Sequence, residues 1–131
     1  MRKETITYID YNGNKRTEDF YFNLNKAEIA VMENSISGGL SEIMRRAVEA
    51  QDMPSLITIF QDLIHKSYGV KTPDGRGFLK KPEDLEMFKA TEAYSELFMK
   101  LATDTDAAIA FAKGIMPADM SENTDVTALT K

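Results

Sequence analysis

His65, the only histidine of the sequence, is the side chain best suited to acid–base chemistry near neutral pH. Gln61 and Asp62 lie about one helical turn before it, but no second histidine and no serine motif stands in a spacing that would form a catalytic triad. The sequence contains no cysteine, which excludes a thiolate nucleophile, a thiolate metal site and a disulfide framework. We therefore interpret His65 as an ordinary surface or boundary histidine and predict a non-enzymatic protein without catalytic residues.

Carboxylates that could bind a cation occur near the C-terminal end, at Asp104, Asp106 and Asp119. They lack the DxDxDG loop and the closing glutamate of a calcium site, so helix capping explains Asp104 and Asp106 better. Other carboxylate pairs lie on expected helices at Glu42 and Glu49 and at Glu92 and Glu96. We interpret these pairs as solvated helix faces, and we predict no metal and no cofactor.

A basic segment spans residues 66–81. Asp74 is its only acidic residue, and its five basic residues are Lys66, Lys71, Arg76, Lys80 and Lys81. Its glycines lack the GxxxxGK[ST] and GxGxxG spacings of phosphate-binding loops. The local charge is +4 within a total of −5, so the rest of the chain carries −9. This asymmetry suits a docking edge for an acidic partner or a neighbouring copy. A loop kept soluble by its lysines is the alternative.

The composition of the 131 residues is that of one globular domain, with 43% hydrophobic and 28% charged residues. We expect the domain to span residues 1–117 and the polar residues 118–131 to form a disordered tail. The net charge of −5 and the pI of about 4.9 argue against a general nucleic-acid-binding protein. The sequence has no run of about 18 apolar residues, so we predict no membrane span. The first ten residues lack the apolar region of a secretory signal.

Residues 4–22 predict a β-hairpin, because two runs rich in Ile, Tyr, Phe and Thr flank an Asn-Gly pair. A two-residue turn would place Ile6 and Tyr8 on the face opposite Phe20 and Phe22. A three-residue loop that ends with Gly13 in the left-handed region places all four on one face. We favour the second register, because burying four large apolar side chains together outweighs the preference for the shorter turn.

Residues 54–69 predict the central helix of the core, with Leu56, Ile59, Phe60, Leu63 and Ile64 at helical spacing. Pro54 suits the first turn of this helix. Gly69 suits a position just past its end that requires a positive φ. Ile57 and Tyr68 widen the apolar face, so we expect several elements to bury this helix.

The remaining elements follow from local signals. Asn25 and Glu28 predict a capping box at the start of a helix. Around this helix we expect Leu24, Ala27, Val31 and Met32 to face the core. Leu40, Ile43, Met44, Ala47 and Val48 predict a second helix after the break at Ser37. Residues 72–75 predict a turn flanked by Val70 and Phe78 in a short ribbon. Three further helices are predicted to begin at Pro82, at Thr91, and at Asp104 or Thr103. Gly114 and Pro117 mark the end of the last helix. The fold class is therefore α+β and mostly α, with an N-terminal hairpin and about five to six helices between residues 25 and 116.

Four segments of the chain, residues 8–29, 37–50, 60–80 and 92–117, are together similar to the tail assembly chaperones of long-tailed phages and prophages of Gram-positive bacteria. The most characteristic parts are DFYFNL (19–24), SYG (67–69) with PDGR (73–76), and EAYSELF (92–98). The resemblance implies a non-enzymatic chaperone that binds and solubilises the tape measure protein and helps to recruit tail tube subunits. It also implies a frameshift-extended form as a partner, location in the bacterial host cytoplasm and absence from the mature virion.

A chaperone of this kind needs adaptable apolar and charged surface rather than a pocket, and the eight methionines suit that need. We predict that partner or self contacts involve Tyr11, Tyr21, Lys71, Arg76, Lys80 and Lys81, with a homo-oligomer as one assembly. The alternative function is a small nucleic-acid-binding regulator, in which the break at residues 37–39 belongs to a helix-turn-helix. A small hydrolase is the third candidate, but the sequence supplies no nucleophile, base and metal set for it.

Overall fold

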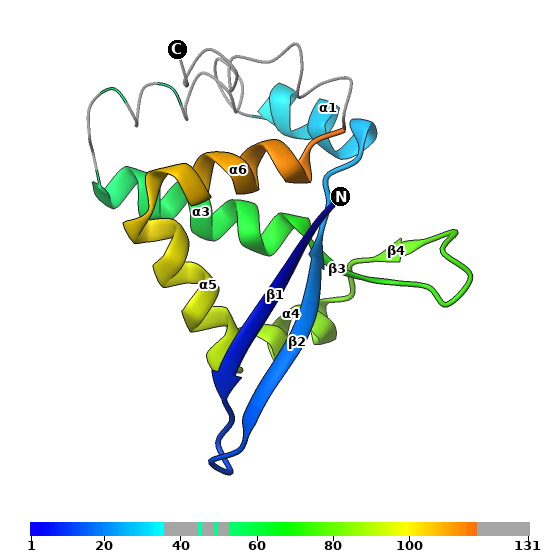
Figure 1. Cartoon of the computed structure of the whole chain (residues 1–131). Helices are drawn as coiled ribbons and strands as arrows, with labels where there is room; N and C mark the ends of the chain where they lie inside the picture. The colour runs from blue at the N-terminus through cyan, green and yellow to red at the C-terminus, as the bar shows by residue number, and fades with distance from the viewer. Residues whose placement is uncertain (36–44, 46–48, 50–52, 118–131) are drawn as a thin grey trace.

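The computed structural model describes residues 1–35, 45, 49 and 53–117. The described elements are β1 (Arg2–Ile9), β2 (Lys15–Phe22), α1 (Lys26–Ser35), α3 (Met53–Ser67), β3 (Tyr68–Lys71), β4 (Phe78–Leu79), α4 (Pro82–Lys89), α5 (Glu92–Thr103) and α6 (Thr105–Ile115). This architecture confirms the predicted α+β class, mostly helical with an N-terminal hairpin (Figure 1). The helix predicted at residues 40–48, the break at 37–39 and the tail 118–131 lie outside the described residues.

The hairpin of β1 and β2 has the predicted register. Asp10 and Asn14 are hydrogen-bonded beyond the strand ends, so residues 11–13 form a three-residue loop, and Gly13 has a φ of 83° in the left-handed region. Ile6, Tyr8 and Phe22 are buried and Phe20 packs against them, so all four face the core. The hydrophobic pattern therefore decided the register against the shorter Asn-Gly turn.

A four-stranded antiparallel sheet forms because β3 pairs with β2, and β4 pairs with β3. The predicted ribbon around Val70 and Phe78 is thus confirmed, and it projects from the body of the molecule (Figure 1). The prediction for Gly69 was wrong, because α3 ends at Ser67 and Gly69 is a strand residue opposite Tyr21 without a positive φ. A Cβ atom at Gly69 would lie 2.7 Å from the Phe78 ring, so close packing explains the glycine.

The core centres on Phe22, whose side chain is fully buried among three aromatic rings. Ring centroids of Phe111, Tyr68 and Phe88 lie 5.3, 5.7 and 5.9 Å from that of Phe22. Helix α3 contributes Phe60, Leu63 and Ile64 to this core, as predicted, whereas Ile57 at the margin of its apolar face is 36% exposed. The core therefore joins a strand residue to the predicted central helix.

Helix termini mostly follow the predicted capping signals. Asn25 and Glu28 form the reciprocal capping box, with backbone N–H to side-chain oxygen distances of 2.9 and 2.8 Å. Thr91 caps α5 and Asp104 caps α6 through their side-chain oxygens. Helix α6 ends at Ile115, between the Gly114 and Pro117 that were predicted to mark its end.

The inward face predicted for α1 was partly wrong. Leu24 and Met32 are buried as expected, but Ala27 is exposed and Val31 is 68% exposed. Ile29, which was not assigned to the core, is only 2% exposed. The helix is therefore rotated relative to the predicted face, which leaves part of its apolar surface open to partners.

Candidate partner-binding surface

We define the basic ribbon as residues 68–81, which comprise β3, β4, the turn between them and the lysines that follow. The turn is held at its base by the Gly75 N–H, which donates to the Thr72 carbonyl at 2.9 Å. The Asp74 carboxylate accepts from the Thr72 hydroxyl at 2.7 Å and from the Arg76 N–H at 3.0 Å, and these bonds lower the pKa of Asp74. The only acidic side chain of the ribbon is thus engaged within the turn.

Lys71 and Tyr21 lie together, as two of the residues predicted for partner contacts. The Lys71 ammonium lies 4.2 Å from the centre of the Tyr21 ring, within the range of a cation–π interaction. This contact connects the basic ribbon to the outer face of β2. The pair therefore forms one combined aromatic and basic surface.

Lys80 has its partners inside the chain. Its ammonium donates to the Asn23 carbonyl and to the Glu28 carboxylate, each at 2.6 Å. Its side chain is only 22% exposed. Lys80 therefore ties the base of the ribbon to the start of α1 and positions the ribbon.

Lys71, Arg76 and Lys81 are the exposed cations of the basic ribbon. Among the residues that the structure describes, neither Arg76 nor Lys81 makes an ion pair or a hydrogen bond through its side chain. Lys66, which precedes the ribbon, pairs with Asp62 at 2.8 Å on the same helix. The exposed positive charge of the ribbon therefore lies at Lys71, Arg76 and Lys81.

Tyr11 does not join this surface, because it lies in the loop of the hairpin, at the other end of β2 from Tyr21. Its side chain is 77% exposed, and its interaction with the Glu92 carboxylate raises the pKa of Tyr11. Tyr11 and Tyr21 are thus separate candidates for contact.

His65 is half-buried, and its Nε2 atom lies 2.7 Å from the Tyr94 hydroxyl. Burial lowers the pKa of His65, and the nearby Lys89 charge lowers it further. This arrangement matches the predicted boundary histidine. In the described part of the chain, no three acidic or histidine side chains are grouped so that they could hold a metal ion.

The sequence interpretation missed an apolar hollow beside α1 of about 350 Å³. It is lined by Leu24, Ala27, Glu28, Val31, Met32 and Lys66. The sequence allowed two inward faces for α1, one with Val31 and one with Ile29. Assigning Ile29 to the core would have turned Val31 outward and indicated the hollow.

The described residues form a small α+β fold whose surface carries exposed apolar and basic side chains. In a comparison with protein-family models, the model described as phage tail assembly chaperone matches residues 1–130. The chain therefore belongs to the phage tail assembly chaperone family. No curated protein and no solved structure matches it. None of the described helices is long and apolar enough to span a bilayer.

Proposed function

We propose that this chaperone binds and solubilises the tape measure protein and helps to recruit tail tube subunits during tail assembly. The family match over residues 1–130 carries the proposal, because a chaperone of tail assembly needs a tail component that is insoluble alone. The tape measure protein is such a component, since its long apolar helices have no partner before the tube surrounds them. The phage would be of the long-tailed type, with a Gram-positive host.

Exposed apolar side chains support this role. Large hydrophobic residues more than half exposed on the described surface are Met1, Ile9, Tyr11, Val31, Met87 and Met99. Methionine adapts its shape to irregular partners, which suits contact with successive turns of a long helix. The hollow beside Val31 can receive a side chain from the apolar face of such a helix.

The basic ribbon supplies the charged part of the proposed surface. Arg76 and Lys81 would meet acidic side chains of the tape measure protein, a tail tube subunit or another chaperone copy, and Lys71 with Tyr21 would extend that contact. Lys80 would act indirectly by holding the ribbon in place. A frameshift-extended form of the chain would be a further partner. The chaperone would act in the host cytoplasm and leave the assembling tail before the virion is complete.

The direct test is retention of tape measure segments, encoded in the same tail gene cluster, on the immobilised full-length chain. We expect retention by the native chain and weaker retention by the double variant Arg76→Glu/Lys81→Glu. The matched control is Lys15→Glu/Lys89→Glu, which makes the same change in net charge at the hairpin end and on α4, away from the ribbon. Failure of the native chain to retain any segment at low salt would overturn the proposal, while equal losses in both double variants would remove the ribbon from it.

A further inference from the structure

The outer edge of β1 is an open strand edge of eight residues. The Asp10 N–H donates to the Asn14 carbonyl, so the pair Asp10–Asn14 is hydrogen-bonded across the hairpin. Pairs alternate along an antiparallel ladder, so the even-numbered residues of β1 bond to β2 and the odd-numbered ones point their backbone groups away. Thr5 and Thr7 therefore present N–H and C=O groups to the free edge, where no described strand pairs with them.

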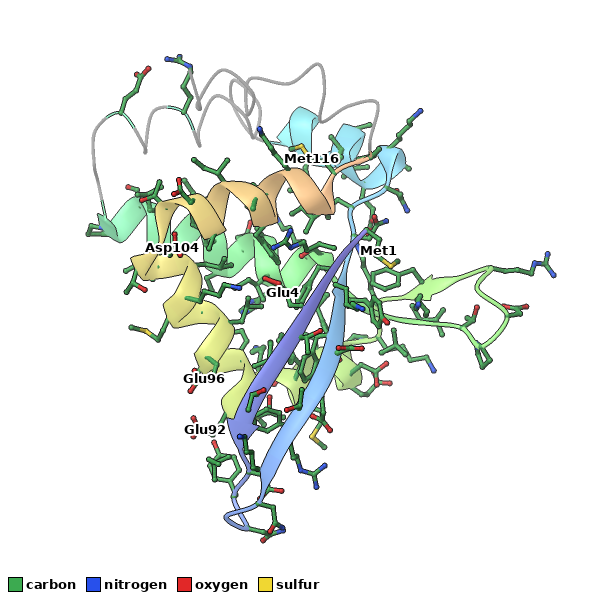
Figure 2. All side chains as sticks on the ribbon, in the orientation of Figure 1. Met1, Glu4, Glu92, Glu96, Asp104 and Met116 are labelled. Atoms are coloured by element: carbon green, nitrogen blue, oxygen red, sulfur yellow. The ribbon has the colours of Figure 1, made fainter. Side chains whose placement is uncertain are left out.

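A groove of about 200 Å³ lies between this edge and α5. Backbone and side chains of Glu4, Ile6 and Thr7 border it on one side, and Glu96, Leu97 and Lys100 border it on the other. Figure 2 labels Glu4 on β1 and Glu96 on α5, the two elements that form its walls. The volume is below the range of about 300–1,000 Å³ of small-molecule sites, so it suits one or two side chains of a peptide.

Glu4 lines the groove with a carboxylate that lacks a hydrogen-bond partner. The residue is 6% exposed, and its Oε1 atom is buried without a hydrogen bond in the described structure. Arg2 Nε, which is also buried without a hydrogen bond, lies 3.6 Å from Oε2, and Lys100 Nζ lies 3.8 Å from Oε1, so both cations are near but too distant for good hydrogen bonds. A buried acceptor left in this state is unfavourable, and a donor that entered the groove would relieve it.

We propose that the groove binds an extended segment of a partner protein as an additional strand along β1. Backbone groups of the segment pair with Thr5 and Thr7, as in recognition by β-strand addition. An arginine or lysine of the segment donates to Glu4 Oε1 and faces Glu96, and an apolar residue two positions along packs against Ile6 and Leu97. With Arg2 counted, the charges around the groove balance, so the free acceptor Glu4 Oε1, rather than the net charge, is what selects a donating side chain. This mode differs from helix binding and does not depend on the tape measure protein as partner.

The test uses the full-length ¹⁵N-labelled chain and a seven-residue peptide in which threonines alternate with valine, arginine and valine. We expect saturable binding, with chemical-shift changes and slower hydrogen exchange at the Thr5 and Thr7 amides. A peptide that is methylated at the backbone nitrogens facing β1 should lose this binding, because those nitrogens can no longer donate hydrogen bonds to the strand. Equal binding of the methylated peptide, or shifts confined to other residues, would overturn the proposal.

The charge preference has its own control. Replacing the central arginine of the peptide by glutamine should weaken binding by roughly 10-fold to 100-fold, as expected for a hydrogen bond to a charged group. Glu4→Gln in the protein should remove most of that preference, whereas Glu83→Gln on α4 should keep it. A preference for arginine that survives Glu4→Gln contradicts the assignment. The same amide shifts on concentrating the chain without peptide would identify a second copy as the occupant and overturn it as well.

Discussion

Lys80 and Lys81 are adjacent lysines of the basic ribbon, and the structure predicts opposite consequences for their replacement by methionine. Lys80 donates two hydrogen bonds of 2.6 Å, to the Asn23 carbonyl and the Glu28 carboxylate, whereas Lys81 is exposed. Hydrogen bonds to charged groups contribute about 1.5–3 kcal/mol, and partial exposure reduces the ion-pair part toward about 1 kcal/mol. We expect Lys80→Met to lower the free energy of unfolding by about 2 kcal/mol and Lys81→Met by less than about 0.5 kcal/mol.

The melting temperature gives the assay. With an unfolding entropy of about 2.1 cal/mol/K per residue, about 2 kcal/mol corresponds to a decrease of about 7 °C for a chain of this size. A double-mutant cycle with Glu28→Gln should give a coupling of about 1 kcal/mol, because glutamine still accepts the capping bond from Asn25 but carries no charge. Equal effects of the two lysine substitutions would refute the assignment of Lys80 as the positioning residue of the ribbon.

Three further outcomes are expected. Gly69→Ala should destabilise the fold by about 1–3 kcal/mol in urea unfolding, because its Cβ would lie 2.7 Å from the Phe78 ring; an unchanged midpoint would contradict the tight packing of β3. Thr91→Ala should lower the free energy of unfolding by about 1 kcal/mol through loss of the α5 cap, and Thr91→Ser should restore most of it. The imidazole of His65 should titrate in NMR spectra with a pKa below its ordinary 6.5. Since the unfolded chain then binds this proton more tightly, stability should rise with pH from the folded pKa up to about 6.5, and a midpoint at or above 6.5 would contradict the burial of His65.

Features governed by neighbouring residues were predictable from the sequence. The hairpin register followed from Ile6, Tyr8, Phe20 and Phe22, because only one loop length places them on one face. The capping box at Asn25 also followed, since its two partners lie three residues apart. Local spacing was therefore sufficient for most helix starts and for the fold class.

Features that depend on distant residues were not predictable in this way. Gly69 follows a strong helical pattern, which made a helix-ending role reasonable, but its conformation is set by pairing with Tyr21, far away in the sequence. Lys80 and Glu28 are 52 residues apart, so no local pattern indicated that Lys80 is engaged within the chain. The face of α1 was misassigned because Ile29 and Val31 both satisfy a helical spacing with different neighbours.

The candidate contact residues divide in the same way. Charge counting found the basic ribbon, and the structure then separates exposed Arg76 and Lys81 from Lys80, which is held by Glu28. Tyr21 joins the ribbon through its strand pairing with Gly69 and the cation–π contact with Lys71, and Tyr11 lies apart from it. Composition thus indicates where charge accumulates, while three-dimensional contacts decide which charges are available.

The most direct measurement of the proposed role is the soluble fraction of the tape measure protein when it is expressed with and without this chaperone. We expect the tape measure protein to aggregate alone and to remain in the soluble fraction, bound to the chaperone, when both are produced. Lys15→Glu should leave this fraction unchanged, and Val31→Asp, which places a charge at the hollow beside α1, should reduce it. A tape measure protein that is equally soluble without the chaperone would contradict the account.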